Sequence, residues 1–483
     1  MPGEVLHDLL DRRADATGDA PAVSVGDRTV THAELRDLSV RLAGWLSARG
    51  VGRGDRVALV LPPSIELVGL IYAVSRVGAA FSVLHDEMPD RVRRHVLADL
   101  EPRLVITEPP AVDVEPATAA LDRPEPGDPV CLIYTSGSTA LPKAVVGEHR
   151  QVVFAAGAIQ AELGYRPDDV VLAPLPLSFD YGLYQLFLGA LSGAHVRFGS
   201  RVDGGAGLLG ALLSSRATVL AAMPAMAPTL LWLLRRHRGE PPAMRMLTTT
   251  GAAMPASAAA ALRRALPRLD VRIMYGLTEC KRVSIMPAGE AARRPGSSGR
   301  PLPGTVVRVL DPDGAELRPG EVGELVVRGP HVMAGYWRRE ELTGLRFRPD
   351  GAGGRELRTG DYGWLDEDGY VYVQGRRDDV YKERGFRVST TEIEAAAAEV
   401  PGVRLAAVLP PSEDRPRAVL VVAGSVQAGA VLEELRNLIE PFKVPNSCHV
   451  LEQLPLSANG KVDRAALAAL LASSGELSIP SAR

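Results

Sequence analysis

The stretch YTSGSTALPKAVV, residues 134–146, follows an apolar run at residues 130–133 that is typical of a buried strand. Its small residues let backbone N–H groups point at one place, and Lys143 and several hydroxyls add donors for an anion. This combination predicts a loop that holds phosphate groups. The spacing is not that of the P-loop, so kinase-like or GTPase-like chemistry is not favoured. A surface turn rich in Ser and Gly is the simpler alternative.

The composition predicts a globular protein of more than one domain. Its 483 residues correspond to two or three domains of roughly 150 residues each. The net charge of -3 indicates neither a nucleic acid nor an anionic membrane as partner. There is no apolar span long enough to cross a bilayer, and residues 1–19 are charged throughout, so we expect a cytoplasmic protein. Three scattered cysteines, Cys131, Cys280 and Cys448, are expected to be free thiols.

Strand-like and helix-like stretches alternate between residues 57 and 275. A helix at 7–16, a hairpin at 22–29 and a helix at 32–49 precede them. The first series has strands at 57–61, 104–107 and 130–134 and helices at 65–77 and 90–99. The second has strands at 170–175, 195–198, 218–222, 246–249 and 271–275 and helices at 181–191, 207–215, 226–236 and 255–266. The alternation predicts two parallel α/β sheets covered by helices, with a ligand crevice at the carboxyl ends of the strands.

The pattern changes from about Gly304 to strands and turns, with strands expected at 305–310, 323–328 and 370–374. A charged cluster at 376–384 ends this β-rich subdomain. A smaller α/β unit follows, with helices at 391–399 and 431–439 and strands at 405–409 and 418–422. We therefore place a hinge at Asp378, between an N-terminal domain (1–377) and a small C-terminal domain (378–483). The Ser-rich tail after Leu471 is expected to be disordered.

Four further clusters carry polar groups. Residues 275–279, YGLTE, end a strand and could offer Mg²⁺ an oxygen ligand, although a helix cap is the common reason for Thr-Glu there. Asp361 could accept two ribose hydroxyls or could stabilise a turn. The cluster GRRD at 375–378 fits a hinge or a surface turn. The segment PLSANGK at 455–461 would, taken alone, be a solvated loop.

Together and in this order, these motifs resemble the adenylate-forming superfamily, which includes acyl-CoA synthetases, luciferase-like enzymes and the adenylation domains of peptide synthetases. The resemblance covers about residues 32–467. It implies a mobile C-terminal domain and the cofactors ATP and Mg²⁺. It also implies two half-reactions: a carboxylate and ATP give an acyl-adenylate and pyrophosphate, and a thiol then takes the acyl group.

The resemblance also implies roles for individual residues. The β- and γ-phosphates would lie on the loop formed by Thr135, Ser136, Gly137, Ser138, Thr139 and Lys143. Thr278 would bind the α-phosphate, and Glu279 would bind Mg²⁺. Asp361 and Arg376 would bind the ribose. The base would lie against Gly251, Ala252 and Tyr275. Lys461 would bridge the substrate carboxylate and the α-phosphate, and then leave as the small domain rotates about Asp378. Ala140 and Ala144 replace the usual glycines, which we expect to stiffen or slow the loop.

The acid pocket is predicted from two charged clusters. Asp180 stands where amino-acid-activating relatives pair an aspartate with the substrate ammonium, although a helix N-cap explains it equally simply. Lys281 and Arg282 would suit a second substrate carboxylate, as in β-amino-acid adenylation enzymes, unless they face solvent. The remaining wall is predicted to contain Tyr181, Tyr184, Ala222, Met223, Thr248, Thr250, Met274 and Val283.

We therefore expect a free-standing enzyme that activates a small amino acid, aspartate-like or β-amino. No carrier segment follows Lys461, so the thiol would come in trans from an acyl or peptidyl carrier protein or from CoA. Two other functions remain open. One is an acyl-CoA ligase for a small or aryl acid; the other is a nucleotide-binding regulatory protein that has lost catalysis.

Overall fold

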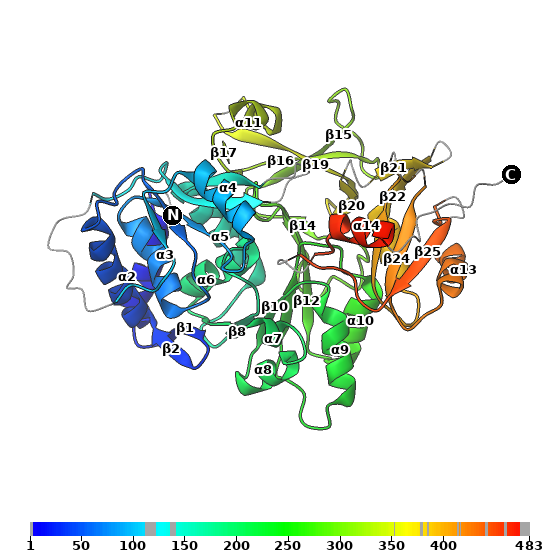
Figure 1. Cartoon of the computed structure of the whole chain (residues 1–483), viewed down its shortest axis with the longest axis horizontal. Helices are drawn as coiled ribbons and strands as arrows, with labels where there is room; N and C mark the ends of the chain where they lie inside the picture. Colours follow the sequence, from blue (N-terminus) through cyan, green and yellow to red (C-terminus); the bar gives the residue numbers. More distant parts are fainter. Residues whose placement is uncertain are drawn as a thin grey trace.

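The computed structural model describes residues 3–111, 122–135, 142–351, 353–376, 380–383, 386–412, 415, 417–439, 443–457 and 461–473. Figure 1 shows the first helices at one end of the molecule and the C-terminal elements at the other. Several elements have the predicted bounds, among them β9 (His195–Phe198), α9 (Met226–Arg236) and β11 (Met246–Thr249). Within the described ranges, no helix is both long and apolar enough to cross a membrane.

A six-stranded sheet contains the hairpin that carries the predicted phosphate loop. Its spatial order is β17 (Gly335–Tyr336), β7 (Lys143–Glu148), β6 (Pro129–Thr135), β4 (Ala80–Val83), β3 (Arg56–Leu59) and β5 (Leu104–Ile106). The strands from β6 to β5 are parallel, whereas β7 and β17 are antiparallel. The loop therefore connects two neighbouring antiparallel strands, and its residues 136–141 lie outside the described ranges.

A nine-stranded sheet forms the second half of the large domain. Its order is β14 (Arg300–Pro301), β13 (Ser284–Ile285), β12 (Asp270–Tyr275), β11, β10 (Val219–Ala222), β8 (Val170–Ala173), β9, β1 (Pro21–Val25) and β2 (Arg28–Thr31). The strands from β12 to β1 are parallel. The N-terminal hairpin thus joins this sheet through β9, although it precedes the first sheet in the sequence.

Helices cover both faces of the nine-stranded sheet. One core lies between the two large sheets and contains α1 (Leu6–Thr17), α2 (His32–Ser47), α3 (Ile65–Arg76), α5 (His149–Leu163) and α6 (Asp180–Ser192). On the other face are α7 (Arg201–Gly204), α8 (Leu208–Ser214), α9 and α10 (Ala256–Ala265). Leu220 and Ala222 belong to the core on the α9 side, and Ala221 and Met223 to the core on the α6 side. Burial on both faces explains why β10 is apolar throughout.

The remaining elements form the β-rich subdomain and the small domain. The first contains β15 (Val306–Leu310), β16 (Gly323–Arg328), α11 (Glu340–Arg346), β18 (Phe347–Pro349), β19 (Arg355–Leu365) and β20 (Val371–Arg376). The second contains β21 (Val380–Glu383), β22 (Phe386–Ser389), α12 (Thr390–Ala397), β23 (Val403–Leu409), β24 (Val419–Gly424), α13 (Ala428–Leu438), β25 (Ser447–Leu451) and α14 (Arg464–Ser473). α4 (Asp90–Leu100) packs on the outer face of the six-stranded sheet.

This arrangement confirms an α/β fold with two wound sheets, a β-rich subdomain and a small α+β unit. The proposed hinge residue Asp378 and the chain beyond Ser473 lie outside the described residues. The alternative interpretation of Asp361, as a residue that stabilises a turn, does not agree with the structure. Asp361 lies inside the long strand β19, directly opposite Arg376 of β20.

Candidate active site

The predicted phosphate loop and the YGLTE segment meet at Tyr336. The hydroxyl of Tyr336 donates to the Glu279 carboxylate at 2.6 Å, and the Lys143 ammonium lies 4.2 Å from the centre of the Tyr336 ring. β17 places Tyr336 there because it pairs with β7, the strand that begins at Lys143. One tyrosine thus holds a cation and a buried carboxylate side by side. Tyr336 could not be recognised from the sequence, because a lone Gly-Tyr-Trp segment carries no recognisable signal.

Asp361 and Tyr275 form the second part of the site. The Tyr275 hydroxyl donates to Asp361 at 2.6 Å, and both side chains are buried. Burial, and then the Asp361 charge, raises the pKa of Tyr275 well above its usual value, so the phenol remains a donor. The backbone N–H of Asp361 donates to Thr359 at 3.0 Å, which fixes the carboxylate further. This carboxylate can accept hydroxyl donors such as those of a ribose.

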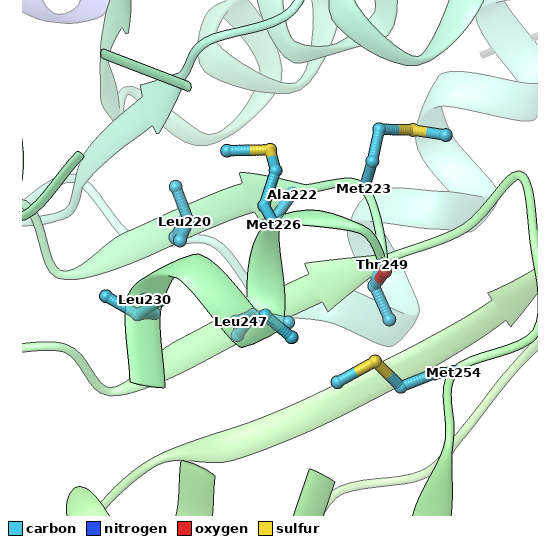
Figure 2. Close-up of a pocket in the computed structure, with 9 residues that line it drawn as sticks. Leu220, Ala222, Met223, Met226, Leu230, Leu247, Thr249 and Met254 are labelled. Carbon is cyan, nitrogen blue, oxygen red and sulfur yellow. The ribbon is translucent and has the colours of Figure 1, made fainter. Parts of the chain in front are cut away.

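Gly251 and Lys461 bring the large and small domains together. The Cε atom of Lys461 lies 3.5 Å from the position that a β-carbon on Gly251 would take. Gly251 has a φ of +89°, a conformation that favours glycine. Met223 borders the same space, and Figure 2 shows it with Met226 and Met254 around an apolar pocket behind Thr249. The absence of a β-carbon at Gly251 thus lets the Met223 and Lys461 side chains approach the backbone here.

Three charged side chains are buried in the predicted acid pocket. Asp180 is 5% exposed, Lys281 1% and Arg282 5%. Within the described ranges, no carboxylate lies within 4.0 Å of either cation, and no cation lies that close to Asp180. Asp180 is the first residue of α6; the cap position is Phe179, and no side chain makes a cap hydrogen bond there. The structure therefore does not support the interpretation of Asp180 as a helix cap.

The turn that carries the two cations is tightly built. Lys281 has a φ of +62°, which is uncommon for a residue with a side chain. A β-carbon on Gly276 would lie 2.0 Å from the Lys281 carbonyl oxygen, so only glycine fits there. The turn closes where the Val283 N–H donates to the Tyr275 carbonyl at 2.8 Å. Backbone strain of this kind is often found where a side chain must be held in place for function.

Tyrosines surround the charged groups. The Arg282 guanidinium lies 4.9 Å from the centre of the Tyr181 ring, and the Lys281 ammonium lies 5.8 Å from that of Tyr184. The Tyr181 hydroxyl is bonded to Thr248 at 2.7 Å. In the part of the chain that the structure describes, the hydroxyls of Tyr184 and Thr250 are buried without a hydrogen-bond partner. Such groups usually find a partner, so both are candidates for ligand contact.

The predicted site residues do not all lie together. The side chain of Ala222 points away from the acid pocket, because strand alternation turns it toward α9 with Thr249. Ala221 faces the pocket side in its place. Thr135, Met274 and Thr278 lie at the crevice ends of β6 and β12, whereas Ala252 is exposed. Ser136, Gly137, Ser138 and Thr139 fall outside the described residues, and of Arg376 only the backbone is described.

The residues present fit ATP and Mg²⁺. Glu279 uses one oxygen for Tyr336, which leaves the other for a metal ion that also binds phosphates. A second group of possible ligands, His7, Asp8 and Asp11, lies on α1. Its carboxylates already pair with Arg123 and Arg76. Glu279 is therefore the better candidate for the metal.

A large cavity lies beside the segment that leads into α6. Its volume is about 680 Å³, and it lies where β3, β4, β8 and β9 end. Its walls combine apolar residues with His85 and five charged residues, Arg28, Asp86, Glu87, Arg197 and Asp203. Ser178 lines it two residues before Asp180, so the cavity reaches the segment that enters the acid pocket. Its size is that of a small-molecule site.

Comparison with known proteins places the chain among enzymes that bind AMP. The family model "AMP-binding enzyme" matches residues 10–337, and the model "AMP-binding enzyme C-terminal domain" matches residues 392–461. One of the plipastatin synthase proteins of Bacillus subtilis is 32% identical over 492 residues. That match covers 96% of this chain but only 19% of the plipastatin synthase protein, so the chain spans about a fifth of that relative.

Two further matches differ in what they act on. The 2-succinylbenzoate–CoA ligase of Bacillus licheniformis is 29% identical over 479 residues, which are 94% of this chain and 98% of the ligase. The solved structure of VinN with L-aspartate is 39% identical with a TM-score of 0.70 and covers 77% of this chain and 99% of VinN.

Proposed function

The chain belongs to the AMP-binding enzyme family, which makes it an ATP-dependent, AMP-forming ligase that uses Mg²⁺, and we propose that it activates an aspartate-like or β-amino acid. The observation that carries this proposal is the set of three buried charges, Asp180, Lys281 and Arg282, without opposite partners among the described residues. Buried charges normally have partners, because removing them from water is costly. A ligand with an ammonium and a second carboxylate would supply these partners.

The chemistry follows from the position of each group. An oxygen of the substrate carboxylate attacks the α-phosphorus of ATP, and the bond from that phosphorus to the bridging oxygen breaks, releasing pyrophosphate. Two anions must approach each other, so cations must neutralise them. We assign this task to Lys461, which lies over Gly251, and to Lys143 on the phosphate side. Thr278 would contact the α-phosphate, and Glu279 would hold a Mg²⁺ ion that supplies further positive charge.

The second step transfers the acyl group to a thiol. The sulfur attacks the acyl carbon, the thiol loses its proton, and AMP leaves. We propose that the thiol belongs to the phosphopantetheine arm of a carrier protein in natural-product biosynthesis. The cavity next to Ser178 supports entry of a long arm, because its volume is about 680 Å³. The similarity to plipastatin synthase also favours a carrier protein, and CoA is the alternative.

The acid is proposed from the pocket and from one comparison. Asp180 would bind the ammonium, while Lys281 and Arg282 would bind the second carboxylate. The protein of the VinN structure, 39% identical to this chain, is described with bound L-aspartate. Tyr181 and Tyr184 close the pocket, which supports a small substrate.

ATP–pyrophosphate exchange tests this proposal. Purified protein should be assayed with α-amino, β-amino, dicarboxylic and simple carboxylic acids. We expect exchange only with acids that carry an amino group, and the fastest exchange when a second carboxylate is present. Asp180→Asn and Arg282→Ala should each lower kcat/KM about 100-fold, because each leaves a buried substrate charge unpaired. Asp90→Asn is the matched control, since Asp90 is also the first residue of a helix without a cap bond.

The other outcomes point to other functions. Exchange with simple or aryl acids alone would overturn the amino-acid proposal and favour a CoA ligase. No exchange with any acid, in protein that binds ATP, would favour a regulatory nucleotide-binding protein. Unequal transfer from the acyl-adenylate to CoA and to a carrier protein would identify the acceptor.

A further inference from the structure

Arg464 links the Lys461 loop to another helix. It is the first residue of α14 and lies three residues after Lys461. Its guanidinium donates to the Glu394 carboxylate of α12 at 2.7 Å. The same carboxylate oxygen accepts the backbone N–H of Val408, at the end of β23, at 2.8 Å. Glu394 thus joins the loop that carries Lys461 to both the helix and the sheet of the small domain.

Backbone hydrogen bonds connect Lys461 to the residues that Arg464 holds in place. The Ser457 N–H donates to the Lys461 carbonyl at 2.7 Å, and the Asp463 N–H donates to the Pro455 carbonyl at 2.9 Å. Leu456 and Val462 pair between these two bonds. Asp463 also accepts the Ala466 N–H, which caps α14. Because this short ladder leads directly into α14, a shift of Arg464 moves Lys461 with it.

The position of Lys461 needs such precision. Its Cε lies close to Gly251 of the large domain, so the side chain crosses from one domain to the other. A displacement of about 1 Å at a reacting group can lower a rate about 100-fold. A lysine on a loop, with a long flexible stem, holds that position only if the base of the loop is fixed.

We propose that the Glu394–Arg464 ion pair is a positioning device that sets Lys461 for adenylation. This inference rests on the proposed function, in which Lys461 acts in the first half-reaction. The contacts of the pair lie within the small domain, so we assign it a role through the loop and not through direct contact with the nucleotide or the acid. Its removal therefore slows formation of the acyl-adenylate and leaves transfer of a preformed acyl-adenylate to the thiol unchanged.

The test measures the two half-reactions separately. Glu394→Gln keeps the shape of the side chain and removes its charge. We expect it to lower kcat for pyrophosphate exchange at least tenfold, with a small change in KM for ATP and for the acid. Thiol transfer from supplied acyl-adenylate should be unchanged. The exchanged pair, Glu394→Arg with Arg464→Glu, should restore part of the exchange rate.

Glu392→Gln is the matched control. Glu392 lies on the same turn of α12 but pairs with Lys443, at 2.7 Å, away from the Lys461 loop. It should leave the exchange rate near that of the parent protein. Equal loss of both half-reactions in Glu394→Gln, or equal effects of the two glutamine variants, would make the pair merely structural and overturn the inference.

Lys461→Ala separates this inference from the proposed function. If Lys461→Ala does not lower exchange, the proposed role of the lysine is wrong. If it does, but Glu394→Gln keeps the full rate, only the positioning inference is wrong.

Discussion

Gly251 determines how closely Lys461 and Met223 approach the large-domain crevice. A β-carbon there would lie 2.8 Å from the Met223 Cε and 3.5 Å from the Lys461 Cε. The left-handed backbone adds a cost of roughly 1 kcal/mol for alanine. We therefore expect Gly251→Ala to raise KM for ATP and to lower the exchange rate several-fold. Steady-state exchange kinetics at varied ATP would measure both.

A second glycine variant separates the free-energy cost of the left-handed backbone from the steric effect of the added β-carbon. Gly289 has a similar φ, +74°, and a β-carbon there would meet nothing within 4 Å. Gly289→Ala should lower thermal stability slightly and leave KM for ATP unchanged. An equal rise of KM in both variants would mean that strain, and not the shape of the crevice, explains the effect.

At the residue scale, the sequence identified groups whose chemistry is recognisable in a short motif. Asp180, Lys281 and Arg282 were predicted as pocket residues, and the structure buries all three. Tyr336 was missed, since its contact with Glu279 depends on the pairing of β17 with β7. Ala222 was predicted in the pocket wall, but its side chain lies on the opposite face of the sheet, because a shift of one residue along a strand reverses the face.

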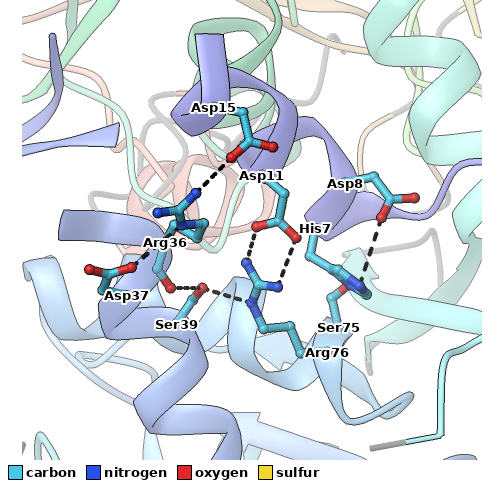
Figure 3. A network of polar contacts seen from close by, with 9 residues as sticks. All are labelled: His7, Asp8, Asp11, Asp15, Arg36, Asp37, Ser39, Ser75 and Arg76. Carbon is cyan, nitrogen blue, oxygen red and sulfur yellow. Dashed lines mark hydrogen bonds and ion pairs between the residues drawn. The ribbon is translucent and has the colours of Figure 1, made fainter. Parts of the chain in front are cut away.

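At the scale of elements, α1 is held against α3 and α5 by two neutral histidines. His7 bonds with the Ser75 hydroxyl at 2.9 Å (Figure 3). His149 accepts the Leu6 N–H at 3.0 Å. Burial, and then Arg76, lowers the pKa of His7 to about 4. Burial, and then His7, lowers the pKa of His149 to about 3. Asp8 and Asp11 oppose this shift at His7, while Arg123 adds to it.

These directions predict how stability depends on pH. The unfolded histidines bind protons near pH 6.5, whereas the folded ones bind them only near the lowered values. The free energy of unfolding should be greatest above pH 6.5, should decrease as the pH falls from 6.5 to about 4 for His7 and to about 3 for His149, and should level off below those values. Complete protonation of one such histidine lowers the free energy of unfolding by on the order of 3 kcal/mol. Denaturant unfolding at several pH values would measure this.

His149→Gln keeps a side-chain acceptor and cannot be protonated. It should show a shallower loss of stability between pH 6.5 and pH 4 than the parent protein. His237→Gln, outside this junction, is the control and should keep the parent slope. Parallel slopes in all three proteins would show that protonation at this junction does not govern the acid sensitivity.

Most elements could be predicted where the apolar period was regular, as in α9 and β11. β4 was not, because its apolar run follows that of α3 with only residues 77–79 between them, and β7 was not, because it begins at the predicted phosphate loop. β19 was missed since Gly360, with a φ of +71°, interrupts its alternation of buried and exposed residues and looks like a turn. β25 pairs in parallel with β24, a long-range contact that no local pattern predicts.

At the scale of the whole molecule, one carbonyl of β20 fastens the small domain to the large one. The hydroxyls of Ser389 and Thr391, at the start of α12, both donate to the carbonyl oxygen of Gln374 on β20. Gly375 allows this approach, because a β-carbon there would lie 3.0 Å from the Thr391 hydroxyl. The contact exists in the arrangement that also places Lys461 over Gly251. It therefore stabilises that arrangement relative to any in which the small domain has rotated.

Thr391→Val keeps the shape of the side chain and removes one of the two donors. A lost hydrogen bond of about 1 kcal/mol would shift the balance between the arrangements about fivefold. We expect the exchange rate to fall by up to that factor and transfer from supplied acyl-adenylate to stay constant or to rise. Single-turnover measurements of both half-reactions would test this. A contact that favours one domain arrangement must favour one half-reaction over the other. A parallel fall of the two rates would therefore mean that the contact supports the fold of α12 and does not select between domain arrangements.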